Sequence, residues 1–172
     1  MEIVVITSSN PEIIKELKPS LIISNNPASA KSLQEHNLPC ILIDNADFED
    51  REEYDLSIKE TLDAFNPDLI ILADYNKIIK SHQLLQEYKD KIINIHLSYL
   101  PEFPGFKAHE QAWKSKAKTS GYTLHRINGE VDKGQILKQE RIDISDCKSA
   151  QEIKNKLSKA AYKWLKELIK SQ

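Results

Sequence analysis

The sequence predicts an α/β fold with a mostly parallel sheet and helices on both faces. Short apolar runs recur along the chain, and segments with helical spacing of apolar residues alternate with them. The runs at residues 3–7 and 69–73 are apolar at nearly every position. Continuous apolar runs of this length are typical of strands that are buried on both faces of a parallel sheet.

Each element follows from a local pattern. We expect strands at residues 3–7, 21–24, 39–43, 69–73, 92–96, 121–127 and 135–142, and helices starting near residues 11, 27, 51, 82, 108 and 150. Pro19 limits the first helix to residue 17. Asp50 and Ser149 match N-cap positions, each followed three residues later by a glutamate. The predicted core stripes are Tyr54, Ile58, Leu62 and Phe65 in one helix, and Ile153, Leu157, Ala161, Trp164 and Leu168 in the last.

Composition narrows the class of protein. The 172 residues suit a single domain, 1–172, and the net charge of −2 argues against a nucleic-acid partner. No apolar stretch reaches the length of a membrane span, and no leader is visible, so we expect a cytoplasmic protein. The two cysteines, Cys40 and Cys147, stand far apart, which indicates neither a disulfide framework nor a metal site.

One stretch carries most of the chemistry. Asn94 and His96 stand two residues apart in a predicted strand, so both side chains point to the same face. Asp132 lies in a later loop flanked by glycines. An amide, an imidazole and a carboxylate together can bind an oxyanion and move a proton. We expect Asp132 to orient His96 and to favour its charged form.

Two motifs resemble the folate-dependent formyltransferase family. The segment NIHLSYLPEFPGFKAHEQA is similar to the family signature NIHPSLLPxFPGxxAHxQA, and GYTLHRINGEVDKGQIL to GxTVHxVxxxxDxGxIL. The phosphoribosylglycinamide formyltransferases are the most similar subfamily. The resemblance implies a Rossmann-like formyltransferase fold and 10-formyltetrahydrofolate as the formyl donor.

The resemblance also assigns roles to residues. It implies that Asn94, His96 and Asp132 are catalytic and that His125 and Ser98 support them. A folate pocket formed largely by backbone is implied for Lys77, Ile78, Ile79, Asn128, Gly129, Glu130 and Val131.

Departures from the family pattern occur near the implied substrate site. The family holds a substrate phosphate with a GNGSN loop, and here the matching segment is Ser9, Asn10, Pro11 and Glu12. Pro11 has no N–H to donate, and Glu12 adds negative charge, so we expect weak phosphate binding. Asp74 and Asn76 also replace small or apolar residues, and we expect Asp74 to narrow the folate pocket.

Several functions stay open at this point. The expected reaction is formyl transfer to a primary amine, with glycinamide ribonucleotide, a substrate of purine biosynthesis, as the default. A different amine such as an amino sugar, hydrolysis of the donor, and a non-catalytic binding module are the alternatives. The related deformylase usually carries an N-terminal regulatory domain, whereas this chain begins with its first strand. We expect small-molecule partners, no nucleic acid and no membrane.

Overall fold

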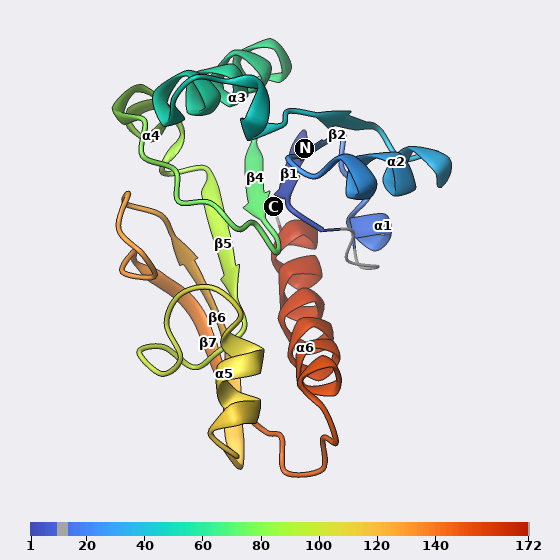
Figure 1. The fold of residues 1–172 in the computed structure, drawn as a ribbon, viewed down its shortest axis with the longest axis vertical. Coiled ribbons are helices and arrows are strands. Elements are labelled where there is room, and N and C mark those ends of the chain that lie inside the picture. The colour runs from blue at the N-terminus through green and yellow to red at the C-terminus, as the bar shows by residue number, and fades with distance from the viewer. Residues whose placement is uncertain (10–13, 172) are drawn as a thin grey trace. The chain divides into compact units, whose positions relative to one another are not determined.

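The structure is a computed structural model that describes residues 1–9 and 14–171, and it has the predicted α/β architecture (Figure 1). The strands are β1 Ile3–Thr7, β2 Leu21–Ser24, β3 Cys40–Leu42, β4 Leu69–Leu72, β5 Ile92–His96, β6 Thr119–Arg126 and β7 Ile136–Asp143. The helices are α1 Ile14–Leu17, α2 Pro27–Glu35, α3 Arg51–Phe65, α4 His82–Tyr88, α5 Ala108–Lys114 and α6 Ala150–Lys170, with a short 3₁₀ turn at Asn45–Asp47. Every predicted element is present, with ends that differ by a few residues; the predicted start of the first helix, near residue 11, lies outside the described residues.

The strands form one sheet in the order β3-β2-β1-β4-β5-β6-β7. Strand β1 pairs in parallel with β2 on one side and with β4 on the other. Strands β6 and β7 pair antiparallel, so the sheet is mostly parallel, as predicted. The chain moves outward from β1 to β2 and β3, then returns to the opposite side of β1 at β4. This reversal makes the carboxyl ends of β1 and β4 a topological switch point, where open α/β sheets bind ligands.

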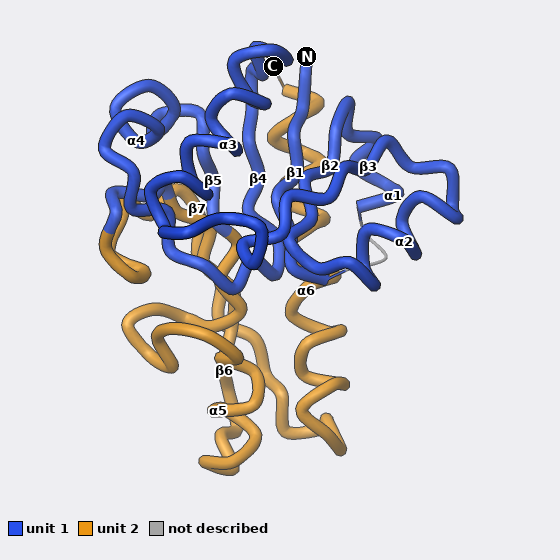
Figure 2. Tube along the Cα trace, turned by 45° about the horizontal axis from the view of Figure 1, so that its top comes forward, with its two compact units in different colours: residues 1–94, 126–129 blue, residues 95–125, 130–172 orange. Residues whose placement is uncertain are grey.

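The described residues group into two compact units, coloured separately in Figure 2. Unit 1 comprises residues 1–94 and 126–129, and unit 2 comprises residues 95–125 and 130–172. Unit 1 contains the parallel strands β1 to β4 and most of β5. Unit 2 contains the antiparallel pair and the last two helices.

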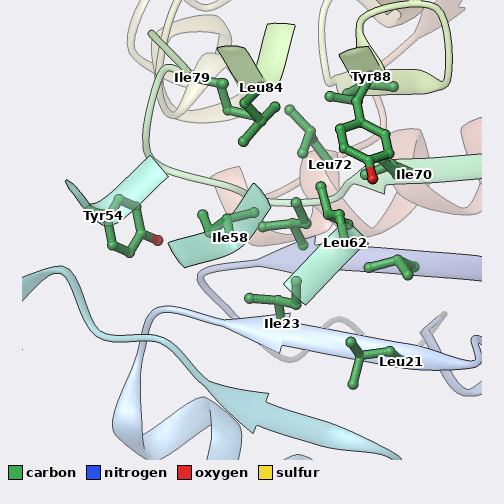
Figure 3. Packing of buried hydrophobic residues seen from close by; sticks show 13 residues of the cluster. Leu21, Ile23, Tyr54, Ile58, Leu62, Ile70, Leu72, Ile79, Leu84 and Tyr88 are labelled. Atoms are coloured by element: carbon green, nitrogen blue, oxygen red, sulfur yellow. The ribbon is translucent and has the colours of Figure 1, made fainter. Parts of the chain in front are cut away.

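The core of unit 1 is an apolar layer between strands and helices (Figure 3). Helix α3 contributes Tyr54, Ile58 and Leu62, and α4 contributes Leu84 and Tyr88. Their partners on the strands alternate in sequence: Val4, Ile6, Leu21, Ile23, Ile70, Leu72 and Ile92. The intervening strand residues, among them Val5, Ile22 and Ile71, are also fully buried. Burial at successive positions explains why these strands read as continuous apolar runs.

The ends of α3 follow the predicted capping pattern. The Asp50 carboxylate accepts a hydrogen bond from the backbone N–H of Glu53, at 2.9 Å. Asn66 ends the helix in the left-handed conformation, with φ of 46°. The prediction that Phe65 belongs to the core stripe is wrong, because its side chain is 42% exposed. It is the last residue of the helix, directly before the C-cap Asn66.

Unit 2 has a smaller core of its own. Its buried apolar residues are Ala112 of α5, Ile144 after β7, and Ile153 and Leu157 of α6. Ser149 caps α6 through a hydrogen bond from the Glu152 N–H, at 3.1 Å.

The buried stripe of α6 differs from the prediction in its second half. Ile153, Leu157 and Ala161 are buried as expected, but the stripe then continues through Tyr162 and Leu165. Trp164 and Leu168 are only partly buried. At about 100° per residue, Trp164 and Leu168 stay within about 60° of Ile153 around the helix, so the predicted stripe does not drift; instead the buried face shifts toward Tyr162 and Leu165 in the second half of the helix.

No helix within residues 1–9 and 14–171 combines the length and the hydropathy that crossing a membrane requires.

Candidate active site

Strand β5 places Asn94 and His96 next to each other along one face. The two residues are separated by one position, and side chains alternate along a strand. His96 is 6% exposed, and Asn94 is half-buried. The backbone register pairs Asn94 with Leu72 of β4, which fixes the amide near the carboxyl end of unit 1's parallel strands.

Within unit 2, Asp132 lies between two histidines. One carboxylate oxygen, Oδ2, is 3.4 Å from Nδ1 of His96, and the other, Oδ1, is 3.4 Å from Nε2 of His125. The backbone N–H of Gly105 also donates to Oδ2, at 2.7 Å. Asp132 has a φ of 52°, a left-handed conformation that aspartate tolerates better than most residues. The fold thus brings together three side chains that the sequence placed on separate elements.

The second nitrogen of His96 faces another acceptor. Its Nε2 is 2.9 Å from the carbonyl oxygen of Phe103, so Nε2 must be the donor in this pair. Because Nδ1 faces the Asp132 carboxylate, both ring nitrogens point at acceptor oxygens. A neutral imidazole carries one N–H, so the Nε2–H bond to the Phe103 carbonyl fixes the ring and leaves Nδ1, beside the Asp132 carboxylate, as the nitrogen that can accept a proton.

The charge state of His96 differs from the expectation. Burial lowers the pKa of His96, and the neighbouring His125 lowers it further, while Asp132 and the Phe103 carbonyl raise it; the net direction is down. Asp132 therefore acts in the expected sense, but burial outweighs it. The imidazole is neutral at pH 7 and can accept a proton, which is the property that a general base needs.

Asp132 stays ionised at neutral pH. Burial alone would raise the pKa of its carboxyl group, but the contact with His125, the electrostatic effect of the His96 ring and the Gly105 N–H together hold the pKa below its ordinary value. A buried carboxylate with these partners can stabilise a proton on His96 as soon as one arrives.

Ser98 and His125 occupy supporting positions. His125 is 2% exposed and contacts the side of Asp132 that His96 does not reach. Ser98 is fully buried, and its hydroxyl donates to the carbonyl of Glu102. Thr123 donates to the Ser98 carbonyl at 2.7 Å. These bonds hold the turn that leads to Phe103, whose carbonyl contacts His96.

The predicted folate segment of unit 1 has support that sequence reasoning missed. Asp55 of α3 is fully buried, and its Oδ2 accepts from the backbone N–H of Lys80 at 2.8 Å and of Ser81 at 3.0 Å. Arg51 bonds to Asp55 at 3.0 Å and donates to the carbonyl of Ile78. A helix on the core side of the sheet thus fixes the backbone beside Lys77, Ile78 and Ile79. The signal was present, since Arg51 and Asp55 are spaced by four residues and Asp55 directly follows the core residue Tyr54.

The other predicted folate-contact residues divide between the two units. Asn128 and Gly129 belong to unit 1, and Glu130 and Val131 belong to unit 2. Gly129 has a φ of 86°, and a Cβ there would stand 3.1 Å from Leu85, so the position favours glycine. Ile79 is buried, whereas Ile78 and Val131 are exposed.

The predicted substrate loop is described only in part. Ser9 lies after β1 and donates to the Asp74 carboxylate at 2.9 Å, while Asn10, Pro11 and Glu12 lie outside the described residues. Ser8 and Asn76 are likewise joined by hydrogen bonds. The departures at residues 8–9 and 74–76 therefore belong to one local structure.

Comparison with known proteins identifies the family. A family model described as formyl transferase matches residues 3–169. The chain is 34% identical over 134 residues to phosphoribosylglycinamide formyltransferase of Bacillus subtilis (strain 168), which covers 78% of this chain and 68% of the relative. It is 30% identical over 156 residues to formyltetrahydrofolate deformylase of Escherichia coli (strain K12), covering 86% of this chain and 55% of that protein. The chain therefore spans about half the length of this second relative.

A solved structure agrees over nearly the whole chain. The crystal structure of phosphoribosylglycinamide formyltransferase from Streptococcus pneumoniae TIGR4 superposes with a TM-score of 0.88 at 29% identity, covering 99% of this chain and 97% of that one. The predicted fold and the predicted class, a folate-dependent formyltransferase, are confirmed. The chain belongs to the formyl transferase family.

Proposed function

We propose that the protein transfers a formyl group from 10-formyltetrahydrofolate to the primary amine of a small molecule. The observation that carries the proposal is the cluster of His96, Asp132 and His125, with Asn94 on the same strand as His96. The match of the formyl transferase family across residues 3–169 supports one formyl transferase domain.

The proposed mechanism begins with the amine. Its nitrogen lone pair attacks the formyl carbon, a carbon–nitrogen bond forms, and the carbonyl oxygen becomes an oxyanion. The Asn94 amide can donate to that oxygen, and one such donor is worth about 10²–10³ in rate. His96, neutral at pH 7, takes up the amine proton, and the Asp132 carboxylate stabilises the resulting imidazolium.

The second half of the mechanism releases the products. The bond between the formyl carbon and N10 of the folate breaks, and the proton held by His96 passes to the departing nitrogen, directly or through water. The products are a formamide and tetrahydrofolate. His96 returns to the neutral state that burial favours.

The folate pocket is proposed at the backbone of Lys77, Ile78 and Ile79, together with Asn128 and Gly129 of the same unit. The folate contacts expected of Glu130 and Val131, which belong to unit 2, stay predictions. Backbone recognition suits this segment because Arg51 and Asp55 fix its carbonyl and N–H groups. The Asp74 carboxylate, which we expect to narrow the pocket, accepts a hydrogen bond from the Ser9 hydroxyl.

Glycinamide ribonucleotide is the first acceptor to test, since relatives named phosphoribosylglycinamide formyltransferase match the chain. The test supplies 10-formyltetrahydrofolate with a panel of primary amines and measures the release of tetrahydrofolate. Release that depends on an amine supports transfer. Release by a His96→Ala variant at the wild-type rate would exclude the proposed site.

Hydrolysis of the donor is the second candidate, favoured by the match to formyltetrahydrofolate deformylase. The same geometry could activate water in place of the amine. Release of tetrahydrofolate without any acceptor, together with formate, would identify this reaction. Absence of release under every condition would leave the third alternative, a non-catalytic binding module.

The remaining proposals concern the binding partners and the cellular location of the protein. We propose that the partners are the folate and a small amine, and that the protein works in the cytoplasm without a nucleic-acid or membrane partner. The net charge of −2 supports the absence of a nucleic-acid partner, because a nucleic-acid surface requires a basic patch.

A further inference from the structure

Five polar residues of unit 1 form a hydrogen-bonded group at the carboxyl ends of the parallel strands. We call Ser8, Ser9, Asn25, Asp74 and Asn76 the switch-point cluster. The serines follow β1, Asn25 follows β2, and the other two residues follow β4 closely. The cluster thus occupies the switch point between β1 and β4, where sheets of this topology bind ligands.

Asn76 is the hub of one half of the cluster. Its backbone N–H donates to the Ser8 hydroxyl oxygen at 2.9 Å, and that hydroxyl donates back to Asn76 Oδ1 at 2.8 Å. The buried Asn25 donates through Nδ2 to the same Oδ1 at 3.0 Å. Two donors on one oxygen fix the orientation of the Asn76 amide.

Asp74 is the hub of the other half. The Ser9 hydroxyl donates to its Oδ2 at 2.9 Å, and the Ser8 backbone N–H donates to its carbonyl oxygen at 3.1 Å. The Ser9 N–H donates to the Thr7 hydroxyl at 3.1 Å. Asp74 has a φ of 52°, so its backbone is held in a left-handed conformation.

These bonds decide what the cluster offers to a ligand. The backbone N–H groups of both serines and both serine hydroxyl protons are already used within the protein. The Asn76 amide also carries two N–H donors, while the Asp74 carboxylate presents about four lone-pair sites, accepts only and gives the cluster its negative charge. A phosphate needs donors and an attractive field, whereas a hydroxyl or ammonium group needs acceptors.

The cluster also stands close to a proposed catalytic residue of the same unit. Register pairing places Ile6, Leu72 and Asn94 in one row across β1, β4 and β5. Ser8 and Asp74 each lie two residues beyond that row, toward the carboxyl ends. A molecule held at the cluster is therefore within reach of the Asn94 amide.

We propose that the switch-point cluster binds the formyl acceptor, and that this acceptor is an unphosphorylated primary amine bearing hydroxyl groups. Its O–H and N–H groups donate to the Asp74 carboxylate and the neighbouring acceptor oxygens. The negative charge of Asp74 repels a phosphorylated analogue and so sets specificity by exclusion as well as by attraction. The inference rests on the proposed function, since it names the acceptor class for that reaction.

A pair of ligands that differ only in the phosphate tests the inference. Glycinamide ribonucleotide and its dephosphorylated ribonucleoside are each titrated into the whole protein by calorimetry, without folate. We expect the ribonucleoside to bind at least about tenfold more tightly than the ribonucleotide, which corresponds to about 1.4 kcal/mol.

A charge-removing variant and a matched control locate the effect. Asparagine accepts the left-handed conformation and keeps an oxygen for Ser9, so Asp74→Asn removes the charge with little backbone disturbance. We expect the preference against phosphate to fall about tenfold in this variant. Asp68→Asn is the control, because Asp68 is an exposed aspartate at the opposite end of the same strand.

The outcomes separate this inference from the proposed function. Tighter binding of the ribonucleotide, binding of neither compound, or an unchanged preference in Asp74→Asn would each overturn the inference. Tetrahydrofolate release, measured with the same two amines, reports on the proposed function independently. Discrimination in binding without release of tetrahydrofolate from any amine of the panel would reject formyl transfer while keeping the binding site.

Discussion

The cluster of His96, Asp132 and His125 in unit 2 and the switch-point cluster in unit 1 use polar side chains in different ways. In unit 2 the contacts are loose, with two nitrogen–oxygen distances of 3.4 Å, and they join ionisable groups. In unit 1 the side-chain bonds of the cluster's serines and asparagines are 2.8 to 3.0 Å long, and they consume hydrogen-bond donors. The first arrangement suits chemistry on a transferred group. The second suits selection of the molecule that receives it.

This difference has a lesson for assigning function. The motifs that carry the family resemblance lie around Asn94, His96 and Asp132, and the departures lie at residues 8–9 and 74–76. We therefore propose that chemistry and recognition are carried by different segments. A match to the first set supports the reaction class, and the second set bears on the acceptor.

The largest expected effect breaks the unit 2 cluster. Asp132→Asn removes the charge that stabilises protonated His96, and we expect the turnover number to fall at least about 100-fold, the scale of losing one charged catalytic partner. Steady-state release of tetrahydrofolate measures it. Asp143→Asn, an exposed aspartate of β7 in the same unit, is the control and should keep wild-type turnover. Near-normal turnover in Asp132→Asn would remove this residue from the mechanism.

The next effect concerns the stability of unit 1. Asp55→Ala removes a buried carboxylate and leaves Arg51 and two backbone N–H groups without it. We expect the free energy of unfolding to drop by about 3 kcal/mol, as when a buried ion pair loses one partner. Urea denaturation gives this value. Glu60→Gln, an exposed position on the same helix, should change it by less than about 0.5 kcal/mol.

The same variant sharpens the proposal for the folate pocket. Because Asp55 holds the N–H groups of Lys80 and Ser81, its loss should weaken binding of a folate analogue about tenfold, even at temperatures where the protein is folded. Calorimetry on the folded variant tests this. Unchanged folate affinity would place the pocket elsewhere in the chain.

A smaller effect is expected from His125. His125→Asn removes a contact that lowers the pKa of Asp132 and a neighbour that lowers the pKa of His96. Both pKa values should rise, and the acid limb of the pH–rate profile should move to higher pH, with a fall of about tenfold in the turnover number. A merely structural histidine would reduce the folded fraction without moving the limb, so the profile is the deciding measurement.

The smallest effect is a pH dependence of stability. The folded-state pKa of His96 lies below its ordinary value of 6.5, so the unfolded chain binds the proton first as pH falls. The free energy of unfolding should therefore decrease below about pH 6.5. Urea denaturation at about pH 7.5 and 5.5 gives the fall in the free energy of unfolding between these pH values for the wild type and for His96→Asn. An equal fall in the two proteins would show that His96 titrates normally.

Much of the fold was predictable because its signals are local. The apolar runs at β1 and β4 and the N-caps at Asp50 and Ser149 depend on residues that are neighbours in sequence. The residues that form the unit 2 cluster were also predicted, because the two motifs contain His96, His125 and Asp132. Trp164 and Phe65 were misplaced because burial depends on which neighbour each turn meets, and spacing alone does not contain that information.

The supporting groups were harder to predict for two reasons. The Phe103 carbonyl and the Gly105 N–H act through backbone atoms, which every residue has, so side-chain patterns cannot identify them. The low pKa of His96 depends on a balance between burial and charge that only three-dimensional distances resolve. Asp74 and Asn76 stood out in the sequence only as separate departures from the family pattern. Their hydrogen bonds to Ser9 and Ser8 were not predictable because they join residues 65 and 68 positions apart.

The backbone of Asp74 has a consequence for how this protein can change. Residue 74 adopts a conformation that glycine reaches freely and that a side chain makes less favourable by about 1 kcal/mol. Aspartate and glycine codons differ by a single base, so Asp74→Gly is an accessible substitution that would relax the chain and remove a negative charge together. The aspartate is therefore an informative residue to follow in any laboratory evolution of this protein, since its loss would be expected to arise first when a phosphorylated amine is supplied as the acceptor.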